Sequence, residues 1–125
     1  MKPDHRQRLG ELGEALASDH LVSRGYSVIE RNFRTRYGEL DLVVADERSL
    51  VFCEVKSRVG KARGLAPLAS VGPAKRGQVR RMARQWLADR GRAGPRPPEL
   101  RFDAIGITLD RHGRLVELDH VEGAF

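Results

Sequence analysis

The sequence GELDLVV at residues 38–44, followed by VFCEVK at residues 51–56, decides the fold. Both runs consist mainly of strand-forming residues, and the turn-prone residues 46–49 lie between them, which predicts a hairpin of adjacent strands. Apolar side chains occupy both faces of each run, as is typical of strands that are covered on both sides. We therefore expect the hairpin to lie centrally in a sheet, with helices packed on at least one face. Cys53 then becomes a small core residue.

Three charged residues, Asp41, Glu54 and Lys56, are set into these apolar strands. An uncompensated charge in a buried strand is costly, so three of them near one end of a hairpin call for a partner such as a metal ion. Strand alternation places Glu54 and Lys56 on the same face, and antiparallel pairing brings Asp41 near Glu54. Carboxylate oxygens suit Mg²⁺ or Mn²⁺, and a neighbouring lysine can orient a metal-bound water. The alternative is a solvated ion pair at the strand ends.

The order of these residues resembles the core of a known nuclease superfamily. Asp41, a hairpin and then Glu54-x-Lys56 are similar to the PD-(D/E)XK, or restriction-endonuclease-like, pattern, although its proline is absent and Glu39-Leu40 precede Asp41. Nearly the whole chain also resembles the YraN-like family of small bacterial proteins. The motifs that carry this second resemblance are Gly10-x-x-Gly13-Glu14-x-x-Ala17, Gly25-Tyr26, Arg31-Asn32-Phe33-Arg34, Gly38-Glu39-Leu40-Asp41-Leu42, Phe52-Cys53-Glu54-Val55-Lys56-x-Arg58 and Arg101-Phe102-Asp103.

The resemblance implies a restriction-endonuclease-like α/β fold, with a mixed β-sheet of about five strands flanked by α-helices, similar to archaeal-type Holliday junction resolvases. It also implies a catalytic site in which Asp41, Glu54 and Glu14 bind Mg²⁺ or Mn²⁺. Glu14 would complete the metal shell directly or through water, and Lys56 would position the attacking water. Glu39 is a weaker candidate for the same site. On helical spacing alone, Glu14 lies at the edge of an apolar face, where a solvated glutamate is equally consistent.

Composition sets the class of protein and of partner. At 125 residues the chain has the length of one domain, and we expect residues 1–125 to form a single nuclease-like unit. The net charge of +6 predicts a polyanionic partner, with DNA favoured over RNA, although an anionic membrane surface or ribosomal RNA would also suit it. The lone cysteine excludes an intrachain disulfide and a cysteine metal cluster. Because there is no apolar leader and no apolar run of about 18 residues, we expect a cytoplasmic protein without a membrane partner.

Apolar periodicity predicts two helices. From Leu9 to Leu21 apolar residues recur every three or four positions, which predicts a helix that ends near Gly25, after a loosely held lead-in at residues 1–8. The apolar face of a second helix, after Pro73, is formed by Val79, Met82, Ala83, Trp86 and Leu87. The predicted order is a helix, strands at 26–33, 38–44 and 51–56, the second helix, and strands at 100–109 and 115–121. The two helices are expected to cover opposite faces of a mixed sheet or to share one.

Residues 56–92 carry eleven basic residues and one acid, Asp89. Phosphate contacts by such residues supply most of the sequence-independent affinity for nucleic acid, whereas the alternative is a solvated helix face. Residues 58–73 are rich in Gly, Ala and Pro, and we expect them to form a mobile basic loop that grips the substrate. The residues expected to contact the nucleic-acid backbone are Arg58, Lys61, Arg63, Lys75, Arg76 and Arg80.

The remaining polar candidates are weaker. Gln78 and Asp103 are considered for the site, and for Asp103 we favour a structural ion pair or a supporting role over metal ligation. His20 is expected to be a surface or half-buried histidine. No role is assigned to His112 or His120, because neither has a partner at ligand spacing.

Together these features predict a Mg²⁺-dependent endonuclease that hydrolyses phosphodiester bonds in DNA, with branched or recombination intermediates as one substrate class. The first alternative is a non-catalytic nucleic-acid-binding module that uses the same basic surface. The second is an accessory subunit that needs a protein partner. The similarity to junction resolvases also makes a homodimer plausible. Substrate shape, the choice between DNA and RNA, and the number of metal ions are left open by the sequence.

Overall fold

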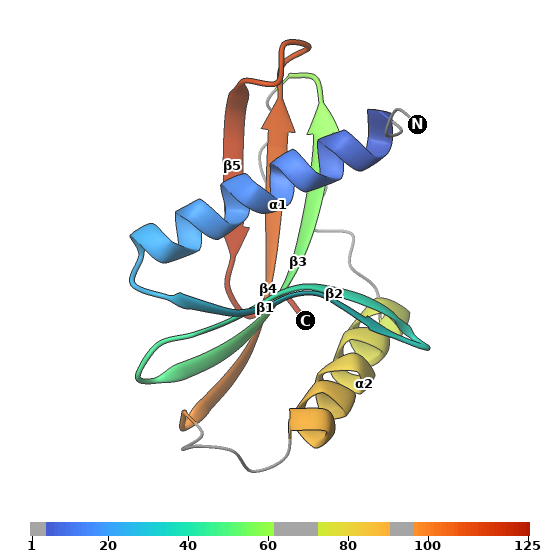
Figure 1. Ribbon diagram of the computed structural model, residues 1–125, viewed down its shortest axis with the longest axis vertical. Helices are drawn as coiled ribbons and strands as arrows, with labels where there is room; N and C mark the ends of the chain where they lie inside the picture. Colours follow the sequence, from blue (N-terminus) through green and yellow to red (C-terminus); the bar gives the residue numbers. More distant parts are fainter. Residues whose placement is uncertain (1–4, 62–72, 91–96) are drawn as a thin grey trace.

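A computed structural model describes residues 5–61, 73–90 and 97–125 of the chain (Figure 1). Within these ranges the chain forms two helices and five strands. In chain order they are α1 (His5–Ser23), β1 (Ser27–Thr35), β2 (Gly38–Ala45), β3 (Ser49–Val59), α2 (Pro73–Arg90), β4 (Glu99–Leu109) and β5 (Leu115–Val121). The predicted α/β fold with a mixed five-stranded sheet is confirmed. Neither described helix is long and apolar enough to cross a bilayer.

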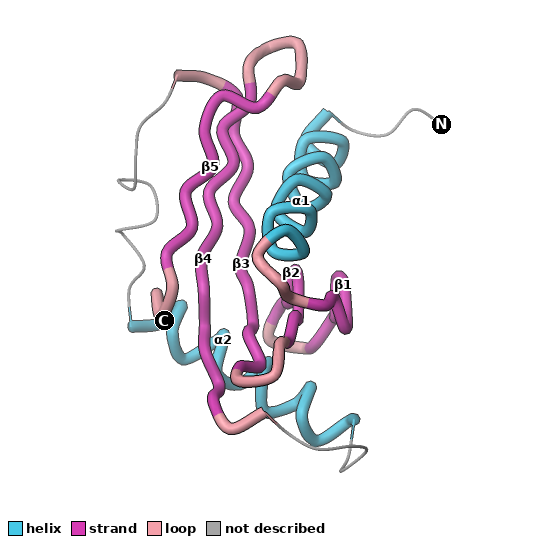
Figure 2. Tube along the Cα trace, turned by 90° about the vertical axis from the view of Figure 1, so that its left-hand side faces the viewer, coloured by secondary structure: helices cyan, strands magenta, loops and turns pink. Residues whose placement is uncertain are grey.

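The sheet has the strand order β1-β2-β3-β4-β5 (Figure 2). Neighbouring strands are antiparallel except β3 and β4, which run parallel from the pair Ser49 and Glu99 to the pair Val59 and Leu109. A parallel pair needs a crossover connection rather than a tight turn, and the segment that contains α2 supplies it. The hairpin predicted from residues 38–56 is the β2–β3 pair.

The two helices lie on opposite faces of the sheet, which resolves the question that the sequence left open. Ala17 and Leu21 of α1 pack in one apolar core that includes Cys53. Trp86 of α2 packs in a second core, where its ring meets the ring of Phe52 edge-on at 5.6 Å between centroids. Cys53 and Trp86 are therefore core residues, as predicted, because each faces a helix-covered side of the central strands.

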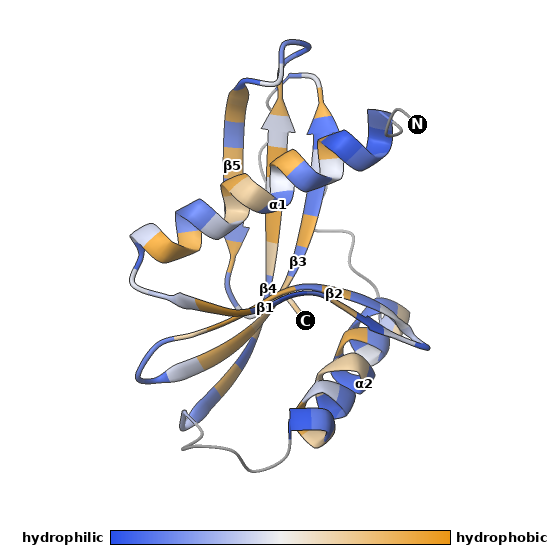
Figure 3. Cartoon of the chain, viewed as in Figure 1, coloured by the Kyte–Doolittle hydropathy of each residue, from blue (hydrophilic) through white to orange (hydrophobic). Residues whose placement is uncertain are grey.

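Two element boundaries differ from the prediction by three residues or more. Helix α1 begins at His5, four residues before Leu9, and its first turn is hydrophilic (Figure 3). Those residues extend the helix into solvent and touch no core, so apolar periodicity could not reveal them. Strand β3 continues to Val59 because its second half pairs with β4. The predicted basic loop therefore starts later, and most of it, residues 62–72, lies outside the described residues.

The β2–β3 pair separates at its end near Asp41. The last paired residues are Leu42 and Cys53, and one step further the Asp41 carboxylate accepts a hydrogen bond from the Val55 backbone N–H at 2.7 Å. Beyond this point β2 pairs only with β1, while β3 pairs only with β4. The side chain of Asp41 thus replaces a main-chain partner where the sheet divides into two parts, visible in Figure 2.

Candidate active site

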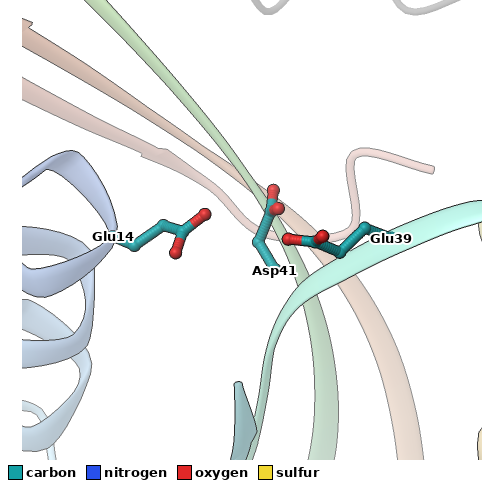
Figure 4. Close-up of side chains that lie close together, drawn as sticks. All are labelled: Glu14, Glu39 and Asp41. Carbon is teal, nitrogen blue, oxygen red and sulfur yellow. The ribbon is translucent and has the colours of Figure 1, made fainter. Parts of the chain in front are cut away.

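Three carboxylates meet where the sheet divides. One oxygen each from Glu14, Glu39 and Asp41 lies within 4.8 Å of the others, and Figure 4 shows Glu14 pointing from α1 toward the two residues of β2. Glu39 and Asp41 are alternate residues of β2 and share its α1-facing side, while Leu40 between them packs in the α2 core. The strand pattern and the position of α1 together produce the cluster.

Gly13 allows α1 to lie close enough for Glu14 to reach β2. It is buried, and a Cβ atom at this position would overlap Ser57 Oγ and fall 2.8 Å from Ser57 Cβ. Any larger residue would push the helix away from β3. Gly13 therefore permits the close contact between α1 and β3, and this contact places the neighbouring Glu14 carboxylate in the cluster.

Burial and mutual repulsion make ionisation of this cluster unfavourable. Desolvation raises the pKa of Asp41 to about 7, the carboxylates of Glu54, Glu14 and Glu39 add to the effect, and the Val55 N–H opposes it. Burial and the Glu39 charge also raise the pKa of Glu14. A cation shared by these oxygens would relieve both the repulsion and the desolvation penalty.

Asn32 stands within the carboxylate cluster, although no sequence pattern predicted it there. The surrounding acceptors assign its amide nitrogen to the side of the carboxylates, where it donates to Glu14 Oε2 and Glu39 Oε1, each at 2.9 Å. Its φ of 52° is left-handed, a conformation that asparagine tolerates better than most residues, and it lies on β1 opposite Asp41. Asn32 belongs to the motif Arg31-Asn32-Phe33-Arg34, but hydrophobic periodicity does not indicate that its side chain lies beside the carboxylates.

Glu54 lies beside the cluster but is not one of its three members. Its Oε1 is 2.7 Å from Lys75 Nζ on the first turn of α2. Its Oε2 is buried without a hydrogen-bond partner among the described residues. Glu54 is near enough to Asp41 for its charge to raise the Asp41 pKa. One oxygen is therefore engaged by lysine, and the other is available to a ligand.

Lys56 is exposed on β3, two residues beyond Glu54 and on the same face of the strand. Its ammonium group forms no ion pair within the described ranges. Glu39, by contrast, is approached on its solvent side by Arg34, with 3.5 Å between Nε and Oε2. The free cationic group of Lys56 thus remains open to solvent or to a substrate.

Several residues expected to contact nucleic acid have structural partners instead of open donors. Arg58 donates through Nε to Thr108 Oγ1 at 3.0 Å. Arg80 donates to the Phe125 carbonyl at 3.3 Å and lies over the Phe102 ring. Lys75 pairs with Glu54 as described above.

The other expected contacts are either exposed or outside the described ranges. Lys61 and Arg76 are exposed, and Arg63 falls outside the described residues. Gln78 donates through Nε2 to the Tyr37 carbonyl, which ties α2 to the β1–β2 turn. Among the predicted basic contacts, Lys61, Arg76 and Arg80 are exposed, and of these only Arg80 has a structural partner within the described ranges.

Asp103 belongs to a separate buried network on the α1 side of the sheet. Arg101 binds both of its oxygens, at 2.9 and 3.0 Å, and His120 Nε2 lies 2.7 Å from Asp103 Oδ2. His20 of α1 follows, with its Nε2 3.1 Å from His120 Nδ1. Asp103 is thus held in a structural ion pair. His20 is half-buried, as expected, and it meets His120, to which we assigned no role, because β5 brings His120 beside α1.

The fold and this site define a small α/β protein with a carboxylate cluster at the division of its sheet. The chain belongs to the uncharacterised protein family UPF0102, whose sequence pattern matches residues 13–107. This confirms the resemblance to the YraN-like family.

Relatives from several bacteria match over nearly their whole length. The chain is 42% identical over 122 residues to a UPF0102 protein of Pelotomaculum thermopropionicum, covering 98% of each chain. It is 44% identical over 119 residues to one of Streptomyces griseus, covering 94% of this chain and 96% of the relative. A UPF0102 protein of Mycobacterium avium is 44% identical over 120 residues, covering 94% of this chain and 90% of the relative.

Proposed function

We propose that this protein is a metal-dependent endonuclease that hydrolyses phosphodiester bonds in DNA, with Mg²⁺ or Mn²⁺ held by Glu14, Glu39 and Asp41. The observation that carries the proposal is the convergence of these three carboxylates, from a helix and a strand, within 4.8 Å of one another. The net charge of +6 adds the positive field that a polyanionic substrate requires.

The donor set suits a hard divalent cation. All three groups offer carboxylate oxygen, which Mg²⁺ and Mn²⁺ prefer over the nitrogen and sulfur donors of other metals. The unpartnered Oε2 of Glu54 lies nearby and gives a fourth oxygen that could serve directly or through water. When bound, the cation would lower the pKa of a coordinated water and stabilise the negative charge that develops on the phosphate.

The roles of the chain's own residues follow from their positions. Asp41 is fixed by the Val55 N–H, which holds one of its oxygens in place and leaves the other for the metal. Lys56 has a free, exposed ammonium group, which can donate to a phosphate oxygen and position the attacking water. Lys75 pairs with one oxygen of the Glu54 carboxylate and so restrains its position. Such restraint is the preorganisation that catalysis by positioned charges needs.

The order Asp41, hairpin, Glu54-x-Lys56 also supports this proposal through its similarity to the PD-(D/E)XK nucleases. In that comparison Glu54 is a metal ligand, and branched DNA is one substrate class. The similarity supports the class of reaction by analogy, since one fold can carry several activities. The positions of Glu39 and Asn32 inside the cluster add residues that the motif alone does not include.

A cleavage assay tests the proposal. Wild-type protein would be incubated under single-turnover conditions with duplex, single-stranded and branched DNA in Mg²⁺, Mn²⁺ or EDTA. We expect cleavage only with a divalent cation. Asp41→Asn and Lys56→Ala should abolish cleavage while leaving DNA binding largely intact, whereas Glu47→Gln, which removes an exposed turn carboxylate, should retain it. Equal cleavage by Lys56→Ala and wild type would contradict the assigned role of Lys56.

A non-catalytic nucleic-acid-binding module is the second candidate, and one observation favours it. The Asn32 amide already bridges Glu14 and Glu39, so these two carboxylates have a partner without a cation. Calorimetric titration with Mn²⁺ separates the candidates, since binding that disappears in Asp41→Asn supports the nuclease. DNA binding without Mn²⁺ binding or cleavage supports the module. An accessory subunit would become active only when its protein partner is added.

A further inference from the structure

A second site is formed between the β1–β2 turn and α2, apart from the carboxylate cluster. A surface hollow of about 690 Å³ is lined there by Arg36, Tyr37, Arg81, Arg84 and Gln85. Three of these five residues are arginines, and Tyr37 and Gln85 are the other two. The lining is therefore cationic, with one aromatic ring and one amide, and contains no carboxylate.

The arginines of this hollow lack acidic partners. Within the described ranges, none of Arg36, Arg81 and Arg84 forms an ion pair with an aspartate or glutamate. All three are exposed, so their charges add rather than cancel at the hollow. Like charges that gather without counter-charges repel, and an anion placed among them is stabilised by every one of them. A polyanion is the ligand that this arrangement favours.

Tyr37 holds two of the guanidinium groups in place. The guanidinium carbons of Arg36 and Arg81 lie 5.0 and 5.7 Å from the centre of its ring, within the range of cation–π contact. Arg36 also donates to the Tyr37 hydroxyl at 2.9 Å. These contacts leave most guanidinium N–H donors free while reducing the freedom that binding an anion would otherwise remove.

A hydrogen bond holds the β1–β2 turn against α2. Gln78 donates to the Tyr37 carbonyl, and Gly38, with φ of 133°, makes room for it, because a Cβ there would lie 2.7 Å from Gln78 Nε2. Arginines of two separate elements are thus kept at fixed separation. A fixed set of donors is what distinguishes a binding site from a collection of mobile surface charges.

We propose that this hollow is a phosphate-binding site that holds the backbone of the same nucleic acid whose cleavage we assign to the carboxylate cluster. The inference rests on the proposed function for its ligand. Guanidinium groups match phosphate oxygens bidentately. Tyr37 precedes Glu39 by two residues, so the hollow adjoins the turn end of the strand that carries two of the three carboxylates. Phosphate contacts of this kind set register without reading sequence.

The test compares two double variants that remove the same charge. Arg81→Gln/Arg84→Gln removes two positive charges from the hollow. The control, Arg111→Gln/Arg114→Gln, removes two exposed arginines from the β4–β5 turn, which lies at the other end of the molecule in Figure 1. Glutamine keeps a high helix propensity, so α2 should persist. Binding of a fluorescein-labelled DNA duplex would be followed by anisotropy in EDTA over a range of KCl concentrations.

The expected result is a specific weakening of binding at the hollow. Arg81→Gln/Arg84→Gln should weaken binding about tenfold and reduce the slope of log affinity against log salt by about 0.9 for each phosphate that is no longer neutralised. The control pair should change affinity by less than about twofold. If the double variant does not fold, Arg84→Gln alone, which removes an exposed guanidinium, should reduce the slope by about 0.9.

The outcomes separate this inference from the proposed function. Equal weakening in the two double variants would overturn it, because general charge would then explain binding, and so would a failure of the wild type to bind DNA. Weaker binding confined to the hollow variants supports it. If that selective weakening is found but the wild type cuts no DNA with any divalent cation, the phosphate site stands and the nuclease assignment falls.

Discussion

At Asp41, burial and three neighbouring carboxylates hold a proton that an unfolded chain would release. With a pKa raised from 3.8 to about 7, this group contributes stability that is present below pH 3.8 and lost as pH rises through about 7. Asparagine removes the charge and can still accept from the Val55 N–H. Since each tenfold change in a protonation equilibrium corresponds to about 1.4 kcal/mol, Asp41→Asn should raise the free energy of unfolding by about 2 to 4 kcal/mol in EDTA at pH 8.

Urea unfolding at pH 5 and pH 8, with and without Mg²⁺, measures this effect. The gain of Asp41→Asn should be smaller at pH 5, because Asp41 is then largely protonated in the folded wild type. Mg²⁺ should stabilise the wild type at pH 8 and leave Asp41→Asn unchanged. Glu47→Gln, at an exposed turn position, is the matched control. If Asp41→Asn is no more stable than the wild type in EDTA at pH 8, then a buried, charged Asp41 carboxylate does not destabilise the fold, and the prediction fails.

Asn32 contributes to stability through its left-handed backbone conformation and through the hydrogen bonds of its side-chain amide. Two substitutions separate these contributions. Asn32→Gly keeps a left-handed φ accessible but removes the hydrogen bonds to Glu14 and Glu39. Bonds to charged groups are worth about 1.5 to 3 kcal/mol each, but Asn32 is exposed and water can replace part of them, so we expect a total loss of about 1 to 3 kcal/mol in EDTA. Asn32→Ala should lose about 1 kcal/mol more, through left-handed strain. If the alanine and glycine variants are equally stable in urea unfolding, the left-handed φ at position 32 does not strain an alanine there.

At the scale of elements, the contact between α1 and β3 sets the position of Glu14. In Gly13→Ala the new Cβ would meet Ser57 Oγ and Cβ, so α1 must move outward, which we expect to lower the free energy of unfolding by about 1 to 3 kcal/mol. Gly10→Ala, where nothing lies within 4 Å, should instead stabilise the helix by about 0.5 to 1 kcal/mol. Thermal and urea unfolding of the two variants provides the comparison.

A second-site change distinguishes this clash from a general intolerance of α1. Ser57→Gly removes both atoms that the new methyl group would meet, so Gly13→Ala/Ser57→Gly should recover part of the stability lost in Gly13→Ala. Strictly additive losses in the double variant would show that the clash is not the cause. The same recovery should appear in metal binding, because Glu14 returns toward β2.

The hydrophobic pattern of the sequence predicted the helices and strands well, but it predicted only part of the carboxylate site. The helices and strands follow hydrophobic periods that the packing on two faces enforces, as at Cys53 and Trp86. Alternation also puts Glu39 on the side of Asp41. Pairing alone, however, could not reveal that β2 joins β3 only from Leu42 onward, or that the distant Lys75 would pair with Glu54. Both results depend on tertiary packing.

Over the whole molecule, a polar network joins the elements on the α1 side of the sheet. Asp103 on β4 binds Arg101, and Arg101 in turn donates to the Tyr26 hydroxyl at 2.7 Å. His120 links Asp103 to His20, so β5, β4 and α1 are connected through side chains. Such a network is stable only while every member keeps its bonding protonation state.

Acidification should therefore weaken this network in two steps. Burial, His120 and Arg24 lower the pKa of His20 below 6.5, so its contribution is present above pH 6.5 and lost as pH falls below that value. Bonds from His120 and Arg101 overcome burial and lower the pKa of Asp103, whose contribution is lost only as pH falls below 3.8. Asp41 gains stability as pH falls over the same range, so the loss is measured in Asp41→Asn, whose urea midpoint should be lower at pH 5 than at pH 7.5.

His20→Gln tests the first step, because glutamine can donate to His120 Nδ1 but does not titrate. In the Asp41→Asn background, the drop in urea midpoint between pH 7.5 and pH 5 should be smaller with His20→Gln than without it. His112→Gln, which removes an exposed histidine of the β4–β5 turn, should keep the full drop in the same background. If His20→Gln and His112→Gln lose the same stability on acidification, the pH dependence does not arise from the network, and the contact between α1 and β5 is only a packing contact.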